Sequence, residues 1–486
     1  MLWICLYFPD LPLSVFARAD AQESPTVVSS ASHRPDVLVA NEAAKQRGIV
    51  AGLSIAAALA LDSEITIRLR DECAEAEALK NIALWAGQWT STISIEPPAG
   101  VLLEVSACLN YFGGLENLLD RIDSGLAEIG FPGVIATAPT AGAASLLARA
   151  GRAIAIQERE ALEREVGALP VELLWGQTLF INATLASQNK WGLTPTTLAG
   201  IGVRTIGELL ALPREGIARR FGQSLLDEID RARGMLPDAR PMFVAPERYH
   251  GQIELPSPVD DAEALLFALK RLVVELAGFL RGRGAGVTRL TCDLVHEDAK
   301  PTSIVLGLSS TRQAEHILNV LRERLSREQL PDRVEAIRLI SEEISPLRIR
   351  EGDFFPGADR NTEAGAQLVE RLRARLGENA VRSLALHADH RPEDAWRYKS
   401  DAAAGPTHPP SRPLRPLWLL PEPRALEGEP AAEEMKLLSG PERIETGWWD
   451  GKEIGRDYFV GRDAKGSELW LYRDRGGRWF VHGVFA

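Results

Sequence analysis

The order of strands and helices predicted for residues 248–346 constrains the fold more than any other feature of this chain. A strand (HGQIEL) precedes a long helix at 262–280. Two strands follow (VTRLTCDLV and PTSIVLGL), and a second helix at 312–328 leads to a last strand (RVEAIRLIS). This β-α-β-β-α-β order is typical of a sheet with both helices on one face. The apolar residues of the first helix recur at helical spacing, which predicts an ordinary core.

Length, charge and cysteine usage limit what the rest of the chain can be. The 486 residues allow about three or four domains. A formal net charge of −12 argues against a histone-like protein held to DNA by its overall charge, although local basic faces remain compatible with DNA binding. Cys5, Cys73, Cys108 and Cys292 have no CxxC spacing, which predicts free thiols in a reducing cytosol.

The N-terminal run MLWICLYFPDLPLSVF predicts a buried strand and a turn rather than a signal peptide. It has no basic segment, and Pro9, Asp10 and Pro12 interrupt it. No other run approaches the roughly 20 apolar residues of a membrane helix. We therefore expect a soluble, cytoplasmic protein with no membrane partner.

Strands and helices alternate over the first 150 residues or so. Residues 2–8 and the segments VLLEVS (101–106) and VIATAP (134–139) predict buried strands, and a helix is expected to begin near Ala141. Residues 40–61 are Ala-rich with Gly48 and Gly52, as in small helices joined by tight turns. This alternation predicts an α/β or α+β layer.

Residues 183–235 are predicted to be all-helical. In LAGIGVRTIGELLAL a helix ends near Gly200 and Gly202, and Thr205 and Glu208 form a capping box that opens the next helix. Such helix–turn–helix units present backbone amides to DNA phosphates. The stretch is basic within an acidic chain, which favours phosphate contact, and a plain helical linker is the alternative. Its arginines are Arg204, Arg214, Arg219 and Arg220.

The last hundred residues change in composition. Residues 401–435 are Pro-rich and predict an extended linker. Residues 436–486 are aromatic-rich segments separated by DAKG and RGG turns, which predicts an antiparallel β module. Its aromatic side chains are expected to build the module's core, with Trp418, Trp448 and Trp449 as candidates for a surface that binds a partner protein.

Several segments together resemble one protein family. They are LWICLYFPDLPLSVFAR, AAKQRGIVAGLSIAAALAL, GVLLEVSACLNYFGG, ATAPTAGAASLLARA, GVRTIGELLALPREGIARRFG and the terminal GPERIETGWWDGKEIGRDYF…WFVHGVFA. In this order they resemble the Y-family (translesion) DNA polymerases, and within them the ImuB-type branch of polymerase-like mutagenesis proteins. The resemblance implies a multidomain α+β fold with palm, fingers, thumb and little finger, followed by a small β-rich module.

The resemblance also assigns boundaries to these parts. They are 1–10 and 76–166 for the palm, 11–75 for the fingers, 167–240 for the thumb, 241–348 for the little finger, 349–360 for a clamp-binding peptide, 361–400 for a helical segment, 401–435 for the linker and 436–486 for the β module.

Nucleotide transfer in the family uses two metal ions about 3.5–4 Å apart, held by clustered carboxylates. The resemblance places Leu6, Ala99 and Gly100 at these carboxylate positions, which implies that the chain binds no catalytic metal and needs no cofactor. Asp10 and Glu104 are the nearest acids that could rebuild a metal site, although Asp10 between two prolines is typical of a turn.

The triphosphate pocket of the family is also altered in this chain. Glu42 and Lys45 stand where the family has Tyr and Arg, and Ser145 stands near the position of a phosphate-contacting Lys. A carboxylate facing a triphosphate is repulsive. The resemblance therefore implies a polymerase fold without polymerase chemistry.

Without polymerase chemistry, the function that the resemblance still implies is binding. DNA contacts are expected from Gly200, Gly202, Arg204, Arg219 and Arg220, and from Arg281 and Arg283, whose turn is equally compatible with a solvated loop. Acids and bases nearly balance over 241–350, which predicts weaker DNA affinity than that of an active family member.

The segment EGDFFPG resembles clamp-binding peptides, with Glu351, Asp353, Phe354 and Phe355 as the matching residues. Adjacent exposed aromatics are typical of a peptide anchor, and packing of the two Phe side chains on the little finger is the alternative. Glu351 in place of the pattern's Gln loses an amide donor.

Two further patterns are not expected to be sites. His387 and His390 have metal-ligand side chains but no Cys nearby, so a surface helix end is expected rather than zinc. Arg371, Arg373 and Arg375 predict the solvated face of a helix.

The resemblance implies a non-catalytic adaptor in damage-induced mutagenesis. Its implied partners are DNA, the sliding clamp, an error-prone replicative-type polymerase and a RecA-like accessory protein of the ImuA type. The alternatives are an active translesion polymerase with an unusual metal site and a protein-only scaffold that never binds DNA.

Overall fold

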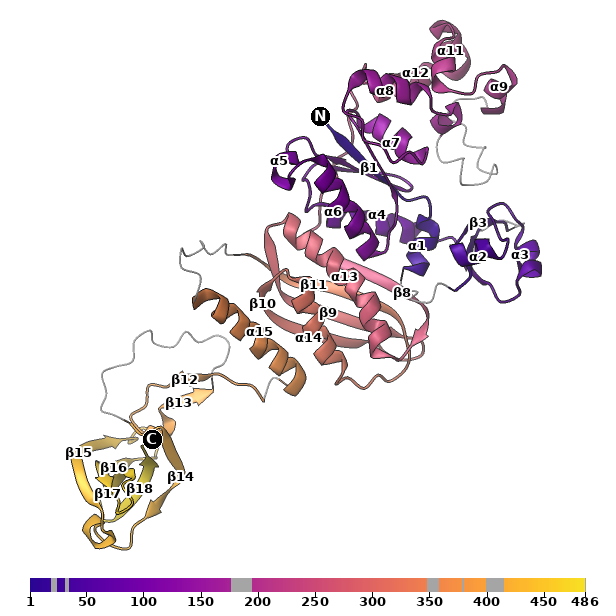
Figure 1. Cartoon of the computed structure of the whole chain (residues 1–486). Coiled ribbons are helices and arrows are strands. Elements are labelled where there is room, and N and C mark those ends of the chain that lie inside the picture. The colour runs from indigo at the N-terminus through magenta and orange to yellow at the C-terminus, as the bar shows by residue number, and fades with distance from the viewer. Residues whose placement is uncertain are drawn as a thin grey trace. The chain divides into compact units, whose positions relative to one another are not determined.

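The computed structural model describes residues 1–18, 24–30, 35–175, 195–347, 358–377, 380–398 and 415–485. The chain divides into two compact units, Met1–Arg375 and Leu376–Ala486 (Figure 1). None of the helices in the described ranges is long and apolar enough to cross a membrane.

The palm of the first unit is a four-stranded sheet in the order β5-β6-β1-β7. The strands are β1 Trp3–Tyr7, β5 Ile93–Glu96, β6 Gly100–Glu104 and β7 Val134–Ala138. All neighbours run antiparallel. Every residue of β1 is buried, as a continuous apolar run predicts for a central strand. The strands expected at 2–8, 101–106 and 134–139 are therefore confirmed.

Helices follow the palm strands along the chain. They are α4 Glu72–Ala86, α5 Leu109–Phe112, α6 Leu115–Ile129 and α7 Ala141–Arg149. Helix α6 buries Leu118, Ile122 and Leu126, which recur every four residues and so share one face. Helix α7 begins where the sequence predicts, because the Thr140 side chain accepts a hydrogen bond from the Ala143 amide.

The fingers contain a sheet that the sequence did not predict. Its order is β3-β2-β4, with β2 Thr26–Ser29, β3 Val37–Ala40 and β4 Thr66–Leu69. The helices are α1 Leu11–Ala17, α2 Glu42–Gln46 and α3 Ile55–Leu61. Asn41 and Ser54 cap α2 and α3. Gly48 and Gly52 have φ of 81° and 88°, a backbone conformation that glycine adopts most readily, so the predicted tight turns are present.

The thumb is helical throughout its described residues. It comprises α8 Arg159–Gly167, the 3₁₀ helix η1 Val171–Trp175, α9 Pro195–Gly200, α10 Ile206–Leu210, α11 Arg214–Phe221 and α12 Gln223–Ala232. The predicted capping box opens α10: Thr205 accepts a hydrogen bond from the Glu208 amide, and Glu208 accepts one from the Thr205 amide.

The little finger has the β-α-β-β-α-β order that the sequence predicts. Its elements are β8 His250–Val259, α13 Ala262–Gly282, β9 Ala285–His296, β10 Thr302–Thr311, α14 Ala314–Leu325 and β11 Val334–Pro346, and the sheet order is β10-β9-β11-β8. Helix α15, Ala358–Leu376, packs on this domain, because Ala374 belongs to its core and Glu370 bonds to His316 at 2.6 Å.

Helix α13 packs closely on the palm helix α4. A Cβ on Gly278 would lie 2.5 Å from Trp85 Cδ1, and a Cβ on Gly282 would lie 2.7 Å from the Gly87 backbone. Side chains at these two positions would prevent that approach. Beside this contact, the buried Arg18 of α1 pairs with the buried Glu275 of α13. Glycines and a buried ion pair thus join the little finger to the rest of the first unit.

The second unit begins with a β-hairpin, which corrects the prediction of a helical segment over 361–400. Helix α15 ends at Leu376, and it is followed by β12 Leu384–Leu386, the 3₁₀ helix η3 Pro392–Asp394 and β13 Trp396–Tyr398. Strands β12 and β13 pair antiparallel.

A five-stranded sheet in the order β14-β18-β17-β16-β15 completes the unit. The elements are β14 Trp418–Ala425, η4 Pro430–Glu433, β15 Lys436–Thr446, β16 Ile454–Arg462, β17 Glu468–Asp474 and β18 Trp479–Val484. The predicted linker over 401–435 is therefore too long, because β14 belongs to the sheet. Its Pro421 and Pro423 fall where the pairing with β18 is irregular, between Leu419 and Arg424, and an edge strand tolerates missing amide donors.

The aromatic residues of this unit divide into core and surface. Tyr458 stacks on Trp470 with ring centroids 4.0 Å apart, and Tyr472 and Trp479 are also buried. Trp418, Trp448 and Trp449 are exposed. The prediction of an aromatic core is confirmed for the first group, and the second group lies on the surface, where a partner could reach it.

Candidate functional site

The paired strands β1 and β6 form the candidate site of the palm. Tyr7 pairs with Gly100, and Leu6 pairs with Val101 and with Ile135 of β7. Adjacent strand residues point to opposite faces of a sheet, so Leu6 and Gly100 do not share a face. In this register Tyr7, rather than Leu6, is the first-strand residue opposite Gly100. Neither residue is a carboxylate.

The acidic side chain nearest to this pair of residues already forms an ion pair within the chain. Glu96 of β5 pairs with Arg240, which also bonds to Asp238 at 3.0 Å. Burial raises the pKa of Glu96, and Arg240 and Arg149 oppose that rise. Burial likewise raises the pKa of the Cys5 thiol to about 12. Because the Glu96 carboxylate already pairs with Arg240, it is a poor ligand for a cation.

Asp10 and Glu104 lie at opposite ends of β1. Asp10 follows the end of the strand beyond Tyr7, whereas Glu104 pairs with Trp3 at its start. At about 3.3 Å per strand residue, this separation excludes a shared two-metal site. The Glu104 carboxylate accepts hydrogen bonds from the Leu2 amide at 3.1 Å and the Ser106 hydroxyl at 2.5 Å. These bonds outweigh the effect of burial and lower its pKa. Burial raises the pKa of Asp10, and Lys45 opposes that rise.

The residues present do not fit the two magnesium ions that a polymerase palm holds. Tyr7, Ala99 and Gly100 offer no carboxylate, and Glu96 and Glu104 are engaged elsewhere. Over the described ranges, no group of three or more His, Cys, Asp or Glu side chains has an arrangement suited to a metal ion.

The residues at the predicted triphosphate contacts differ in exposure and in charge. Glu42 and Lys45 lie on α2 and pair with each other at 3.7 Å with both side chains exposed. Ser145 lies on α7 and is buried. The exposed carboxylate of Glu42 remains unfavourable for a triphosphate.

The thumb carries the predicted DNA-binding residues on its surface. Gly200 ends α9, and Gly202 has a φ of 85° in the turn before α10. Arg204, Arg219 and Arg220 are exposed. Arg214 differs from them because it pairs with Asp230 at 2.5 Å. The turn and three exposed arginines thus lie in one small helical domain.

Arg281 and Arg283 make contacts within the chain. Arg281 donates to the Gln88 side chain at 3.1 Å, and Arg283 donates to the Ala245 carbonyl at 3.3 Å and to the Pro246 carbonyl. Burial lowers the pKa of Arg281, and the nearby Arg312 adds to the effect. These two arginines therefore hold the little finger against neighbouring segments, although both remain exposed in part.

Several polar side chains of the little-finger sheet form ion pairs and hydrogen bonds with one another. Arg289 pairs with Glu342 at 3.0 Å, and Arg338 donates to Gln252 at 3.0 Å. Asp293 accepts from Ser303 at 2.6 Å. Such a face offers little net positive charge to a phosphate backbone.

The two remaining sequence predictions concern the clamp-binding segment and the histidines after β12. The clamp-binding residues Glu351, Asp353, Phe354 and Phe355 lie outside the described residues. His387 and His390 follow the strand β12 rather than a helix end, which corrects that expectation, and His387 Nδ1 lies 2.9 Å from the Asp394 carbonyl oxygen.

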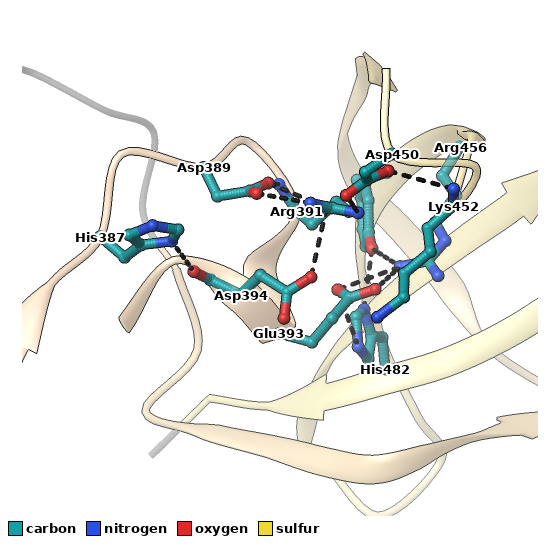
Figure 2. Close-up of polar contacts among 10 residues, drawn as sticks. His387, Asp389, Arg391, Glu393, Asp394, Asp450, Lys452, Arg456 and His482 are labelled. Carbon is teal, nitrogen blue, oxygen red and sulfur yellow. Dashed lines mark hydrogen bonds and ion pairs between the residues drawn. The ribbon is translucent and has the colours of Figure 1, made fainter. Parts of the chain in front are cut away.

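Sequence reasoning missed the ionic cluster around Arg391 (Figure 2). The buried Arg391 pairs with Asp389 at 2.7 Å and with Asp450 at 2.8 Å, and Arg456 pairs with Glu393 at 2.9 Å. The cluster joins the loop after β12 to the five-stranded sheet. The run Asp389 to Asp394 is dense in charge, but no sequence signal connects it to Asp450 or Arg456.

The palm sheet, the helical thumb and the β-α-β-β-α-β domain follow one another in the order that the Y-family resemblance implies. Residues 7–149 match the impB/mucB/samB family. Among solved structures, the chain is similar to a ternary complex of Dbh, with 18% identity, a TM-score of 0.39 and coverage of 70% of this chain and 98% of that chain. It is also similar to DinB from Sulfolobus solfataricus, with 17% identity, a TM-score of 0.37 and the same coverage, 70% and 98%.

Two individual proteins are similar to this chain over most of its length. The chain is 26% identical over 477 residues to Protein ImuB of Caulobacter vibrioides strain NA1000 / CB15N, which covers 90% of this chain and 100% of that protein. Protein ImuB of strain ATCC 19089 / CIP 103742 / CB 15 matches with the same values, 26% identity over 477 residues. The chain is thus similar to these two ImuB proteins over 90% of its length.

Proposed function

We propose that this chain is a non-catalytic adaptor in DNA-damage tolerance. It binds primer–template DNA through its thumb and brings an error-prone polymerase, with a RecA-like accessory protein, to the sliding clamp. The family match and the similarity to ImuB proteins support the role in damage tolerance. The observation that supports the absence of catalysis is that Leu6, Tyr7 and Gly100, on the paired strands β1 and β6, carry no carboxylate.

The thumb supports the DNA-binding part of the proposal. The turn at Gly202 is exposed on the surface of the thumb, beside the start of α10. The exposed arginines Arg204, Arg219 and Arg220 add positive charge. The little finger contributes less, because its sheet arginines are engaged and Arg281 and Arg283 contact the chain itself.

Fluorescence anisotropy with labelled primer–template DNA at low salt tests this binding. The Arg219→Ala, Arg220→Ala variant should bind more weakly, and its salt dependence should fall by about one unit of slope per lost phosphate contact. The Arg473→Ala, Arg475→Ala variant removes the same charge from the second unit and serves as the control. An absence of binding by the unchanged chain would favour the protein-only scaffold.

Clamp binding is tested separately by pull-down with the purified sliding clamp. Replacement of both Phe354 and Phe355 by Ala should abolish capture while the circular dichroism spectrum stays unchanged. Equal capture of the variant would remove this segment from the proposal.

A further inference from the structure

A cavity of about 650 Å³ lies in the second unit between the hairpin and the five-stranded sheet. Leu386 and Trp396 of the hairpin line one side. Leu419 of β14, Ile444 of β15 and Trp470 of β17 line the other. Its walls combine these aliphatic and aromatic side chains with the charged side chains of Arg415, Glu442, Arg443 and Glu445.

The cavity lies where the two edges of the sheet approach each other. Strands β14 and β15 stand at opposite ends of the strand order, and among the described strands each pairs with one neighbour only. Arg415, just before β14, pairs with Glu442 of β15, and its guanidinium lies 4.9 Å from the centre of the Trp470 ring. An unpaired edge carries backbone donors and acceptors that an added strand can satisfy.

The hairpin that covers the cavity is fixed in place. Arg391 joins the loop to Asp450, and Glu393 joins it to Arg456 (Figure 2). The Arg391 side chain also lowers the pKa of Asp389 to about 2. Because these charged side chains bond to one another across the loop and the sheet, the cavity is formed before any ligand arrives, which reduces the entropy cost of binding.

Exposed apolar side chains occur in the cavity lining and next to it in the sequence. Leu386 is 54% exposed and Trp396 is 45% exposed, and at the start of β14 Leu417 and Trp418 are 79% and 70% exposed. Clusters of this kind mark interaction sites. At the rim, Glu442 pairs with Arg415 and Arg443 pairs with Asp457, whereas Glu445 has no ion pair within the described residues. Glu445 is therefore the lining carboxylate with which a basic group of a ligand can pair.

We propose that this cavity receives an extended segment of a partner protein. The segment adds as a strand to the free edge of β15, inserts an apolar side chain between Trp396 and Trp470, and places a Lys or Arg side chain at Glu445. The inference rests on the proposed adaptor function, because it names one of the surfaces through which the chain meets a protein partner.

A display library of random 12-residue peptides, selected on the full chain, is the first probe. Selected peptides should alternate apolar residues with a basic residue. Their affinity should fall about tenfold for the Leu386→Ala, Trp396→Ala variant and for Glu445→Lys. Leu384→Ala, on the same strand but outside the cavity, is the matched control and should bind normally. Hydrogen exchange should slow at the backbone amides of 442–446 when peptide is bound.

Recovery of no such peptide, or equal binding by the cavity variants and the wild type, would overturn the inference. So would protection at 442–446 that rises with chain concentration alone, because the edge would then be covered by a second copy. The purified error-prone polymerase, accessory protein and clamp are the second set of probes. If none of the three binds although cavity-dependent peptides do, the adaptor function fails and the peptide site stands.

Discussion

Tyr7, the last residue of β1, lies directly opposite Gly100, the first residue of β6, and these are the two central strands of the palm sheet. Burial raises the pKa of the Tyr7 phenol, against the influence of Arg149. The phenol is therefore neutral at neutral pH and cannot balance the charge of a divalent ion. The Tyr7–Gly100 pair therefore offers no negative charge to a magnesium ion.

The buried ion pair between Arg18 and Glu275 should contribute to stability. Their side chains are 4% and 0% exposed, so removing one leaves the other charge buried without its partner. We expect Arg18→Met to lower the free energy of unfolding by about 3–5 kcal/mol, measured by urea denaturation. Lys80→Met, which breaks the exposed pair with Glu77, should change it by no more than about 1 kcal/mol. Equal effects would contradict the assignment.

Close packing of α13 on α4 depends on Gly278. An alanine Cβ there would lie 2.5 Å from Trp85 Cδ1 and 2.9 Å from the Trp85 carbonyl oxygen. Gly278→Ala should therefore destabilise the first unit by about 1–3 kcal/mol, seen as a lower thermal midpoint. Gly365→Ala in α15, where nothing lies within 4 Å of the new Cβ, should leave stability unchanged or raise it by up to about 1 kcal/mol. A neutral Gly278→Ala would show that the two helices are not in close contact.

The second unit should lose stability in mild acid because of His482. Burial lowers the pKa of His482 to about 4 from its ordinary value of 6.5, with Glu393 opposing and Arg456 adding to the effect. Its Nδ1 also lies 2.8 Å from the Tyr458 hydroxyl. The unfolded chain then binds the proton more readily, so stability is retained above pH 6.5 and falls as pH drops toward 4.

The expected slope is about 1.4 kcal/mol per pH unit between these values. Calorimetry of the wild type and His482→Gln from pH 7.5 to 5 would measure it. The variant should show a flatter dependence. Parallel curves for the two proteins would mean that the pKa of His482 is the same in the folded and the unfolded chain.

The cysteines should differ in reactivity. Cys5 and Cys292 are buried, and burial raises the pKa of each thiol to about 12. Cys73 is exposed. Because the thiolate is the nucleophile, iodoacetamide should label Cys73 first in the folded chain, as mass spectrometry of peptides would show. Rapid labelling of Cys5 would indicate that the palm core opens.

Local patterns allowed much of the fold to be predicted. The strands β1, β6 and β7, the little-finger order and the Thr205 capping box all depend on spacing within a short window. The fingers strands were missed because each has only four residues, too few to show an alternation. Strand β14 was assigned to the linker because Pro421 and Pro423 are typical of irregular chain, yet an edge strand accepts them.

The candidate site was less predictable for a physical reason. A shift of one residue in strand register moves a side chain to the other face of the sheet, so the sequence alone does not determine whether Leu6 or Tyr7 lies opposite Gly100. The pairs Arg18–Glu275 and Arg391–Asp450 join segments far apart in the sequence. Only the folded chain brings them together.

The most direct test of the account is metal-dependent nucleotide incorporation by the purified chain on a primer–template, with Mg²⁺ or Mn²⁺. We expect no extension beyond the level of the Asp10→Asn and Glu104→Gln variants, which report any contaminating polymerase. Template-directed extension by the wild type that either substitution abolishes would contradict the central claim, because the palm would then hold catalytic metal ions.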